Sequence, residues 1–351
     1  MHDRGEANTR KDRAYGVWMR ICAVILVFAA LYYAGTVFAP LAFALLAIAI
    51  LWPVQKRLQK LMPQLLALTV VIVVTIAIVM ELSSLITWSF GRVGRYVASN
   101  AANFQVIYGH AAEWLQAHGV PVVGIWAEHF NVVWLARMFR EITVWMSSVL
   151  TFSAVMLTYI ILGLLEIDSI SAKLRALENR DLGEMLLAGG SRTGERMRMY
   201  MLVRSLVSLV TGLLVWGFAA AVGLDLALEW GVIAFVLNFI PIIGTFIATI
   251  APTIIAFAQF GSWEMGLVIF ACLNLIQFLV GSYLEPRIAG RALSISPFMV
   301  LFAVFFWTFL WGIAGAFIGV PILIAIVTLC EQHPSSRWIA ELLASPGDRP
   351  A

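Results

Sequence analysis

The sequence predicts an all-α polytopic membrane protein with about eight membrane segments, two of them broken or hairpin-like helices in the C-terminal half. Hydrophobic residues make up 62% of the 351 residues and charged residues only 12%, about half the charged fraction of an ordinary soluble domain. Such a chain needs lipid rather than water around most of its surface. Apolar runs close to the length that crosses a bilayer recur at 17–38, 41–54, 63–88, 144–165, 201–223, 230–260, 265–284 and 297–328.

The first three spans are expected within residues 17–88, after a cytoplasmic N-terminal tail at 1–16. Val17–Phe38 is longer than a signal-peptide core and no clean cleavage box follows it, so we expect it to be retained as a span. Pro40 predicts a tight turn, after which 41–54 returns across the membrane. That second run is short, so we expect it to be tilted or to thin the bilayer locally.

Two connectors separate the middle spans. Residues 89–143 are predicted to form an external connector, because their apolar residues recur three or four positions apart. The pattern fits two interfacial amphipathic helices broken near Gly119-Val-Pro121, and it fits equally a small soluble helical hairpin packed on the bundle. The fourth span follows at 144–166. Residues 167–200 carry charges of alternating sign, which predicts a solvated cytoplasmic helical connector.

The predicted transport core is 201–330, followed by a cytoplasmic tail at 331–351. At a rise of 1.5 Å per residue, the run 230–260 is too long for one upright span and short for two. Pro241 and Gly244 divide it, so we expect a helical hairpin or a broken helix. Its turn should lie inside the protein, because exposed irregular backbone is not tolerated in lipid.

A second hairpin-like element is expected at 297–328, where Gly312, Gly315, Gly319 and Pro321 interrupt the run. The glycine cluster has a superficial likeness to a dinucleotide-binding loop. No strand precedes it, however, and the surroundings are apolar, so close helix packing of the GxxxG type at Gly315 and Gly319 is the better interpretation.

The distribution of basic residues predicts the orientation. With both termini in the cytoplasm and both hairpins returning to their side of entry, 19 of the 23 Lys and Arg residues lie on the cytoplasmic side. The positive-inside rule therefore favours a multi-pass protein with cytoplasmic N- and C-termini.

Enzyme signatures are missing from the sequence. It contains no HExxH, GxSxG or GxxxxGK[ST] motif, and its three cysteines show no CxxC spacing. The five histidines lie outside the spans. We therefore expect no catalytic activity, no metal, no cofactor and no nucleic-acid partner.

Polar residues inside the spans are the candidates for function. Glu81 lies in the third span, where an ionisable group is costly and usually faces a bundle interior. It would serve proton or substrate coupling, or it simply lies at the interface beside Ser83. Asn238, Asn274 and Gln277 would line a path or hydrogen-bond between helices, and the second use is the commoner one.

The Glu285-Pro286-Arg287 motif places opposite charges at the cytoplasmic end of a span. It fits an ion pair that locks a loop, and it fits a gate. Arg204 could pair with Glu166 or with Glu285, and the sequence does not choose. The candidates for the transport path or gate are Glu81, Asn238, Pro241, Gly244, Asn274, Gln277, Glu285, Pro286, Arg287 and Gly290.

Three motifs in the C-terminal half of the chain resemble those of the AI-2E family of bacterial inner-membrane transporters. They are Asn238-Phe-Ile-Pro241-Ile-Ile-Gly244, the stretch from Tyr283-Leu-Glu285-Pro286-Arg287 through Gly290 to Pro297, and the Gly312, Gly315, Gly319-Val-Pro321 ending. The resemblance implies homo-oligomers that move a small solute or signalling molecule, with H⁺ or Na⁺ as candidate coupling ions. Some members are linked to export of autoinducer-2 and others to Na⁺/H⁺ antiport. Many carry an aromatic residue where this chain has Ile242.

Three functions remain open at this point. The first is a secondary exporter or permease in which the two broken elements meet near mid-membrane. The second is a passive oligomeric pore. The third is a membrane scaffold that transports nothing and acts through the connector at 167–199.

Overall fold

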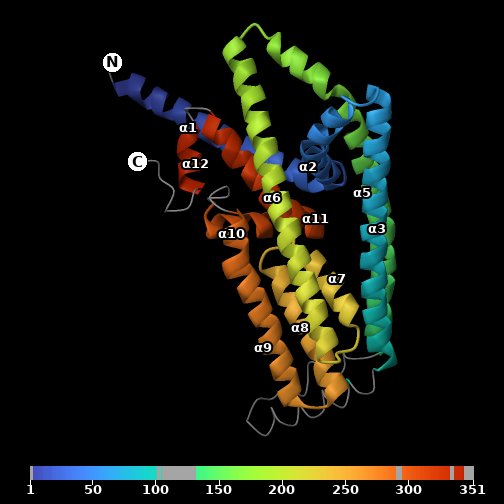
Figure 1. Cartoon of the computed structure of the whole chain (residues 1–351). Helices are drawn as coiled ribbons and strands as arrows, with labels where there is room; N and C mark the ends of the chain where they lie inside the picture. Colours follow the sequence, from blue (N-terminus) through green and yellow to red (C-terminus); the bar gives the residue numbers. More distant parts are fainter. Residues whose placement is uncertain (1–2, 101–103, 105–131, 290–294, 333–335, 344–351) are drawn as a thin grey trace.

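The computed structural model describes residues 3–100, 104, 132–289, 295–332 and 336–343, and these residues form helices joined by short turns (Figure 1). In chain order the elements are α1 (Asp3–Tyr33), α2 (Gly35–Leu58), α3 (Gln64–Ser99), α5 (Val132–Arg175), α6 (Arg180–Ala221), α7 (Ala227–Leu237), α8 (Ile243–Phe260), α9 (Trp263–Leu279), the π-helix η1 (Val280–Leu284), α10 (Glu285–Ala289), α11 (Pro297–Gln332) and α12 (Arg337–Leu343).

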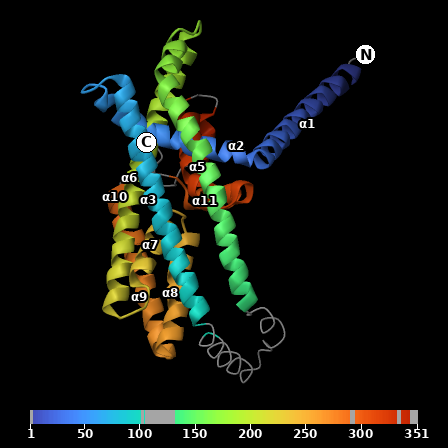
Figure 2. The same cartoon turned by 90° about the vertical axis from the view of Figure 1, so that its right-hand side faces the viewer.

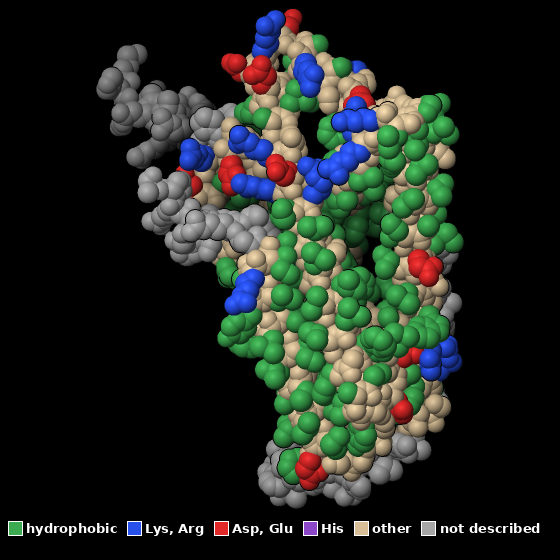
Figure 3. Space-filling model, viewed as in Figure 1, with side chains coloured by type: hydrophobic (Ala, Val, Ile, Leu, Met, Phe, Trp, Pro, Cys, Tyr) green, Lys and Arg blue, Asp and Glu red, His purple; other side chains and the backbone are tan. Residues whose placement is uncertain are grey.

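Helices of membrane-spanning length dominate the described residues. Seven segments are long and apolar enough to cross a bilayer, and Trp18–Tyr33 and Ala227–Leu237 are shorter apolar helices. Large apolar side chains stay exposed along most of these helices, and they cover much of the surface seen in Figure 3. The predicted class, an all-α polytopic membrane protein, is therefore confirmed.

The helices pack into two groups. In the first, α2, α3 and α5 share a core around Ile48, Leu68 and Ile160, and α3 lies beside α5 along the long axis (Figures 1 and 2). In the second, α6 to α9 enclose a core that includes Trp230 and Ile255. The N-terminal end of α1 projects away from both groups (Figure 2).

The N-terminal helices differ from the prediction. The break between α1 and α2 lies at Ala34, not at Pro40, and α2 is a 24-residue helix that contains Pro40. Pro40 is the sixth residue of α2 and removes one interior backbone hydrogen bond, a loss that helices of membrane proteins tolerate. The apolar part of α1, Trp18–Tyr33, is shorter than the 17–38 span we expected.

The connectors are largely extensions of the spans. The 36-residue α3 continues to Ser99, and the 44-residue α5 begins at Val132, so helix ends do not coincide with the predicted boundaries at 89 and 143. The predicted break near Gly119-Val-Pro121 lies outside the described residues. The charged segment 167–200 is formed by the end of α5, a turn at 176–179 and the first half of α6. The Asn179 side chain accepts a hydrogen bond from Leu182 N at 3.1 Å and caps α6.

The run 230–260 is a helical hairpin. Helix α7 ends at Leu237, the chain turns over 238–242, and α8 runs back beside α7 (Figure 1). Helix α8 is followed by Gly261, whose φ of 60° is the left-handed conformation common at helix ends. We call the segment 227–260 the first hairpin.

Helix α11 is also a hairpin. The backbone leaves helical geometry at Trp311 and at Gly312, where φ is 60° and ψ is −140°. The two arms then pack against each other, because a Cβ at Gly315 would overlap Trp307 O, and a Cβ at Gly319 would lie 3.0 Å from Ala303 O. Gly315 and Gly319 therefore lie at close contacts between the two arms. We call the segment 297–332 the second hairpin.

The turn of the first hairpin contacts the arms of the second hairpin, and the two turns do not contact each other among the described interactions. Phe239, in the turn of the first hairpin, stacks on Phe317 in the second arm of the other at a ring distance of 6.2 Å. Ile240 shares a core with Val304 and Val320. The turn of the second hairpin instead contacts α1, where Trp311 Nε1 donates to Leu31 O at 2.9 Å. The expected meeting of two broken elements occurs, but only the first presents its turn.

Charged side chains gather over the upper half of the molecule in Figure 3, the half that holds both described ends of the chain in Figure 1. Lys56 pairs with Asp168 at 2.9 Å, and Arg196 pairs with Glu331 at 2.8 Å. Arg198 Nη1 donates to Ala49 O at 2.8 Å. These contacts tie α2 to α5 and to α6, and α6 to the end of α11.

Candidate functional site

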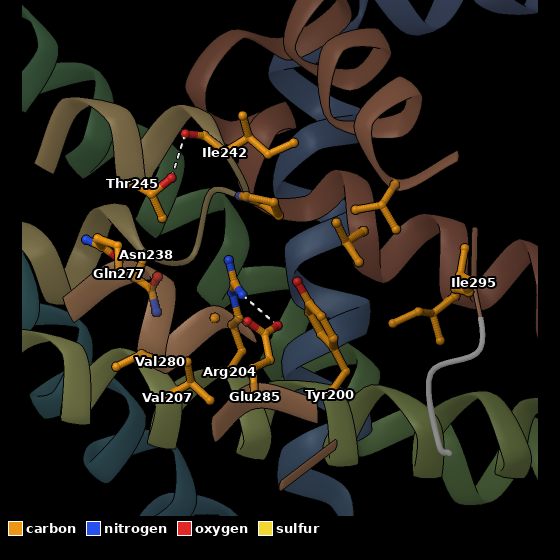
Figure 4. Close-up of a pocket in the computed structure, with 15 residues that line it drawn as sticks. Tyr200, Arg204, Val207, Asn238, Ile242, Thr245, Gln277, Val280, Glu285 and Ile295 are labelled. Atoms are coloured by element: carbon orange, nitrogen blue, oxygen red, sulfur yellow. Dashed lines mark hydrogen bonds and ion pairs between the residues drawn. The ribbon is translucent and has the colours of Figure 1, made fainter. Parts of the chain in front are cut away.

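A cavity of about 330 Å³ lies where the turn of the first hairpin meets α6, the end of α9 and the second hairpin (Figure 4). Its volume is at the lower end of the range for small-molecule sites. A few polar side chains and a larger number of apolar side chains line it. The lining residues are Tyr200, Arg204, Val207, Asn238, Pro241, Ile242, Thr245, Gln277, Val280, Gly281, Glu285, Ile295, Val300, Val320 and Ile324.

An ion pair crosses one side of this cavity. Arg204 Nη1, on α6, lies 2.9 Å from Glu285 Oε1, at the start of α10. The Arg204 side chain is 7% exposed and that of Glu285 is 34% exposed. Figure 4 shows both side chains beside Tyr200. Of the two partners that the sequence left open for Arg204, the structure assigns Glu285.

The π-helix η1 positions Glu285. The backbone N–H of Glu285 donates to Val280 O, five residues back, where an α-helix would use the carbonyl four residues back. Such a π-turn inserts one residue into a helix and is frequent at functional sites. Val280 is buried and lines the cavity.

Two amide side chains, those of Asn238 and Gln277, also line the cavity. Asn238 Nδ2 donates to Ser208 Oγ on α6 at 3.1 Å, and both residues are buried. Gln277 Nε2 and Arg204 Nε are buried without a hydrogen-bond partner among the described residues. An unpaired buried donor costs about 1–3 kcal/mol, and both of these donors belong to residues that line the cavity.

The turn of the first hairpin is strained at Ile242. This residue has φ 66° and ψ −59°, and Ile243 N donates to Pro241 O at 2.7 Å, which closes a three-residue γ-turn of the rare positive-φ type. A β-branched residue is unfavourable there by roughly 1–3 kcal/mol, and such strain clusters at functional sites. The Ile242 side chain lines the cavity and is 57% exposed.

Gly244 allows the same turn to close. A Cβ on Gly244 would overlap the carbonyl oxygen of Leu237, the last residue of α7. Thr245 follows and donates from Oγ1 to Ile242 O at 2.8 Å (Figure 4). The Pro241 motif therefore shapes a turn whose side chains face the cavity.

The structure places several sequence candidates away from the cavity. Glu81 is exposed near the middle of α3. Asn274 is exposed on α9 and donates to Phe270 O of its own helix at 2.8 Å. Pro286 and Arg287 are exposed on α10.

The remaining candidates are structural or undescribed. Gly290 lies outside the described residues. Gly312 forms the second turn, Gly315 and Gly319 pack between the two arms, and Pro321 is buried in the second arm.

Sequence reasoning missed several lining residues. Tyr200 was assigned to the charged connector, yet it lies one helical turn before Arg204 and therefore on the same face of α6. Thr245 lies one residue after the predicted Gly244 and could have been found from the motif. Val320 and Ile324 carry no signal, because apolar residues of a span look alike whether they line a cavity or face lipid.

Within the described residues, no group of three or more His, Cys, Asp or Glu side chains could hold a metal ion. A second hollow of about 310 Å³ lies between α3, α6 and α7, beside Leu82, Leu213 and Trp216, and its described lining is apolar.

Comparison with known proteins gives a consistent result. The model of the AI-2E family transporter matches residues 21–335. The chain is 26% identical over 327 residues to the AI-2 transport protein TqsA of Escherichia coli (strain K12), covering 92% of this chain and 93% of that protein. It is 32% identical over 199 residues to a Borreliella burgdorferi protein named "Putative transport protein", and the match covers 56% of this chain and 54% of that protein.

Proposed function

Because this chain belongs to the AI-2E transporter family, we propose that it is a secondary exporter or permease that moves a small solute through the cavity beside the first hairpin. The proposal places it in the bacterial inner membrane with both termini in the cytoplasm, as homo-oligomers, with H⁺ or Na⁺ as the coupling ion. The observation that carries the proposal is that a strained helix turn and several polar side chains line one cavity between spans.

The arrangement supports transport for a physical reason. Backbone that is not helical is tolerated at membrane depth only where protein or a water-filled cavity surrounds it. The turn of the first hairpin lines a cavity, and the Asn238 and Thr245 side chains supply hydrogen-bonding groups there. Solute sites of secondary transporters are commonly built from such broken helices.

The lining supports a small solute without net charge. Arg204 and Glu285 are the charged residues of the described lining, and they neutralise each other at 2.9 Å. An ionic solute would leave a charge without a partner in a buried site, which is costly. The mixture of amide, hydroxyl and branched apolar side chains suits a compact solute with both polar and apolar surface.

Flux measurements with the purified chain in proteoliposomes test the proposal. A panel of small polar solutes, with AI-2 included because of the name of the Escherichia coli relative, is measured for uptake and efflux under imposed H⁺ or Na⁺ gradients. We expect saturable flux of an uncharged solute that responds to one of the gradients. Solute flux that does not respond to either imposed ion gradient would identify a passive pore. Absence of flux for every solute would favour the scaffold.

A further inference from the structure

We propose that Glu285 is the carboxylate that binds and releases a proton during the transport cycle, and that Arg204 positions it. This inference rests on the proposed function, because it assigns a role within the same cavity. The proton arrives from water in the cavity and binds a carboxylate oxygen of Glu285. The ion pair is then lost, while Arg204 keeps its charge.

The exposure of the pair is unequal, and this asymmetry decides which partner meets water. The Glu285 side chain lines the cavity and is 34% exposed, whereas that of Arg204 is 7% exposed. A proton can therefore reach the carboxylate while the guanidinium stays out of water. Arginine does not lose its own proton in proteins, so a change of charge in this pair takes place at Glu285.

Protonation of Glu285 would destabilise the present conformation. Arg204 Nε already lacks a partner, and Glu285 is the described ion-pair partner of the guanidinium. A buried charge that loses its partner is strongly unfavourable. The conformation relieves this by separating α6 from α10, which would open the cavity to one side of the membrane. Proton binding and cavity access are coupled in this way.

The π-helix makes the contact sensitive to such a change. One inserted residue turns everything after it by about 100° relative to a continuous α-helix. The bond from Glu285 N to Val280 O fixes the insertion immediately before the carboxylate. Conversion of η1 to an α-helix would therefore rotate Glu285 away from Arg204 without unfolding α9 or α10.

No other described charge competes for this role at the cavity. Arg204 and the Tyr200 hydroxyl face Glu285 from α6, Gln277 on α9 and Asn238 of the first hairpin are neutral, and the described lining from the second hairpin is apolar. Arg287, on the same short helix as Glu285, is exposed.

A proton-binding acid of this kind needs a buried basic partner and access to the cavity, and two other acids of the spans, Glu81 and Glu229, do not have both. Glu81 is exposed on α3 outside the cavity lining. Glu229 is 2% exposed, but it pairs with Arg92 at 2.8 Å near the start of α7, at the end of the first hairpin opposite its turn. Glu285 is the acid of the described spans that has both a buried basic partner and access to the cavity.

A cysteine-labelling experiment tests the proposal without a known solute. Cys22, Cys272 and Cys330 are replaced by alanine, Thr245→Cys is introduced as the reporter, and the full chain in proteoliposomes is labelled with MTSET, a membrane-impermeant cationic methanethiosulfonate. The rate is divided by that of Gln64→Cys, an exposed position at the start of α3, to remove the pH dependence of the thiol reaction.

We expect the normalised rate to change by about tenfold, an ordinary size for coupling between two sites, as pH falls from about 8 to about 5, where carboxylates begin to bind protons. Glu285→Gln should hold the low-pH rate at every pH, and Glu285→Asp should restore the dependence. Glu81→Gln is the matched control and should behave as the parent. A parent rate that ignores pH, or a Glu285→Gln rate that still follows it, would overturn the proposal.

Two further measurements make the result decisive. If Glu285→Gln fails to fold because Arg204 is left alone, the double variant Arg204→Gln/Glu285→Gln removes both charges and should give a rate independent of pH; a rate that still follows pH overturns the proposal. If a solute is transported but the labelling rate does not depend on pH, the role of Glu285 is overturned while the transport function stands. Labelling that depends on Glu285 without flux of any solute would overturn the transport function, and with it the coupling role.

Discussion

The two helical hairpins differ in how they turn, although similar proline and glycine signals mark both in the sequence. The first turns through the strained, non-glycine residue Ile242, and its side chains line a cavity with polar groups. The second turns at Gly312, where φ is 60°, and its turn is held by a hydrogen bond from Trp311 to Leu31. Strain is retained at the turn that faces the cavity and is absent at the turn that holds α1.

The difference shows that a break in a span does not identify a solute path. A helix can be interrupted to build a site or merely to reverse direction. The second turn is surrounded by aromatic contacts, such as Tyr32 stacked on Phe309 at 5.8 Å and Trp307 beside Trp311 at 4.6 Å. We therefore interpret the first hairpin as the working element and the second as its support.

The largest effect is expected where a side chain would prevent a hairpin from closing. Gly244→Ala would place a Cβ on Leu237 O, and Gly315→Ala would place one on Trp307 O. Overpacking typically costs about 1–3 kcal/mol, and more where backbone is the obstacle. We expect both variants to lose folded protein in thermal unfolding measurements in detergent. Gly217→Ala, in α6 with open space around it, is the control, and parent-like melting of Gly244→Ala would contradict the hairpin geometry.

The next effect separates the two turns. Gly312→Ala should destabilise the fold by about 1–3 kcal/mol, because φ 60° with ψ −140° is a region for glycine. Ile242→Gly removes strain, so its stability should stay within about 1 kcal/mol of the parent or rise, while flux changes. Denaturant or thermal unfolding of both variants measures this. Equal losses of stability would remove the distinction between a strained and a relaxed turn.

A smaller effect on stability is expected at Asn238. The variant Asn238→Ala loses the bond to Ser208, and hydrogen bonds between membrane helices contribute about 0.6 kcal/mol on average. Flux should fall or change selectivity, because the amide lines the cavity. Asn274→Ala is matched to it and should transport as the parent does, because that amide bonds its own helix on an exposed face. Equal flux from the two variants would argue against a path at the first hairpin.

The smallest effect is expected at the second turn. Trp311→Phe keeps an aromatic ring but removes the bond to Leu31 O, so stability should fall by only about 0.6 kcal/mol. Flux in proteoliposomes should be unchanged. A strong loss of flux with intact melting behaviour would show that the second turn also belongs to the transport path.

The sequence was sufficient for the architecture of the C-terminal half but not for its contacts. Run lengths together with Pro241, Gly244 and Gly312 predicted two broken elements, because chain length in a bilayer leaves few alternatives. The partner of Arg204 depended on which helix lies beside α6, and the π-turn that aims Glu285 leaves no pattern in the residues. Neither could be read from spacing.

In the N-terminal half, by contrast, the sequence led to a wrong position for a turn. Pro40 was interpreted as a turn because proline usually ends a helix, yet the break lies at Ala34. The neighbouring Gly35 is favoured there because it packs closely on the Trp311 ring, from which a Cβ would lie 3.1 Å. That reason lies nearly three hundred residues away in the chain, so no local pattern contains it.

The most direct test of the central claim is to block the cavity beside the first hairpin. Thr245→Cys and Ile313→Cys are each introduced into the cysteine-free chain, and solute flux in proteoliposomes is measured before and after labelling with a bulky maleimide. Thr245 lines the cavity, whereas Ile313 is exposed beside the second turn. We expect labelling to abolish flux through the Thr245→Cys variant and to spare the Ile313→Cys variant. Undiminished flux through fully labelled Thr245→Cys would contradict the account.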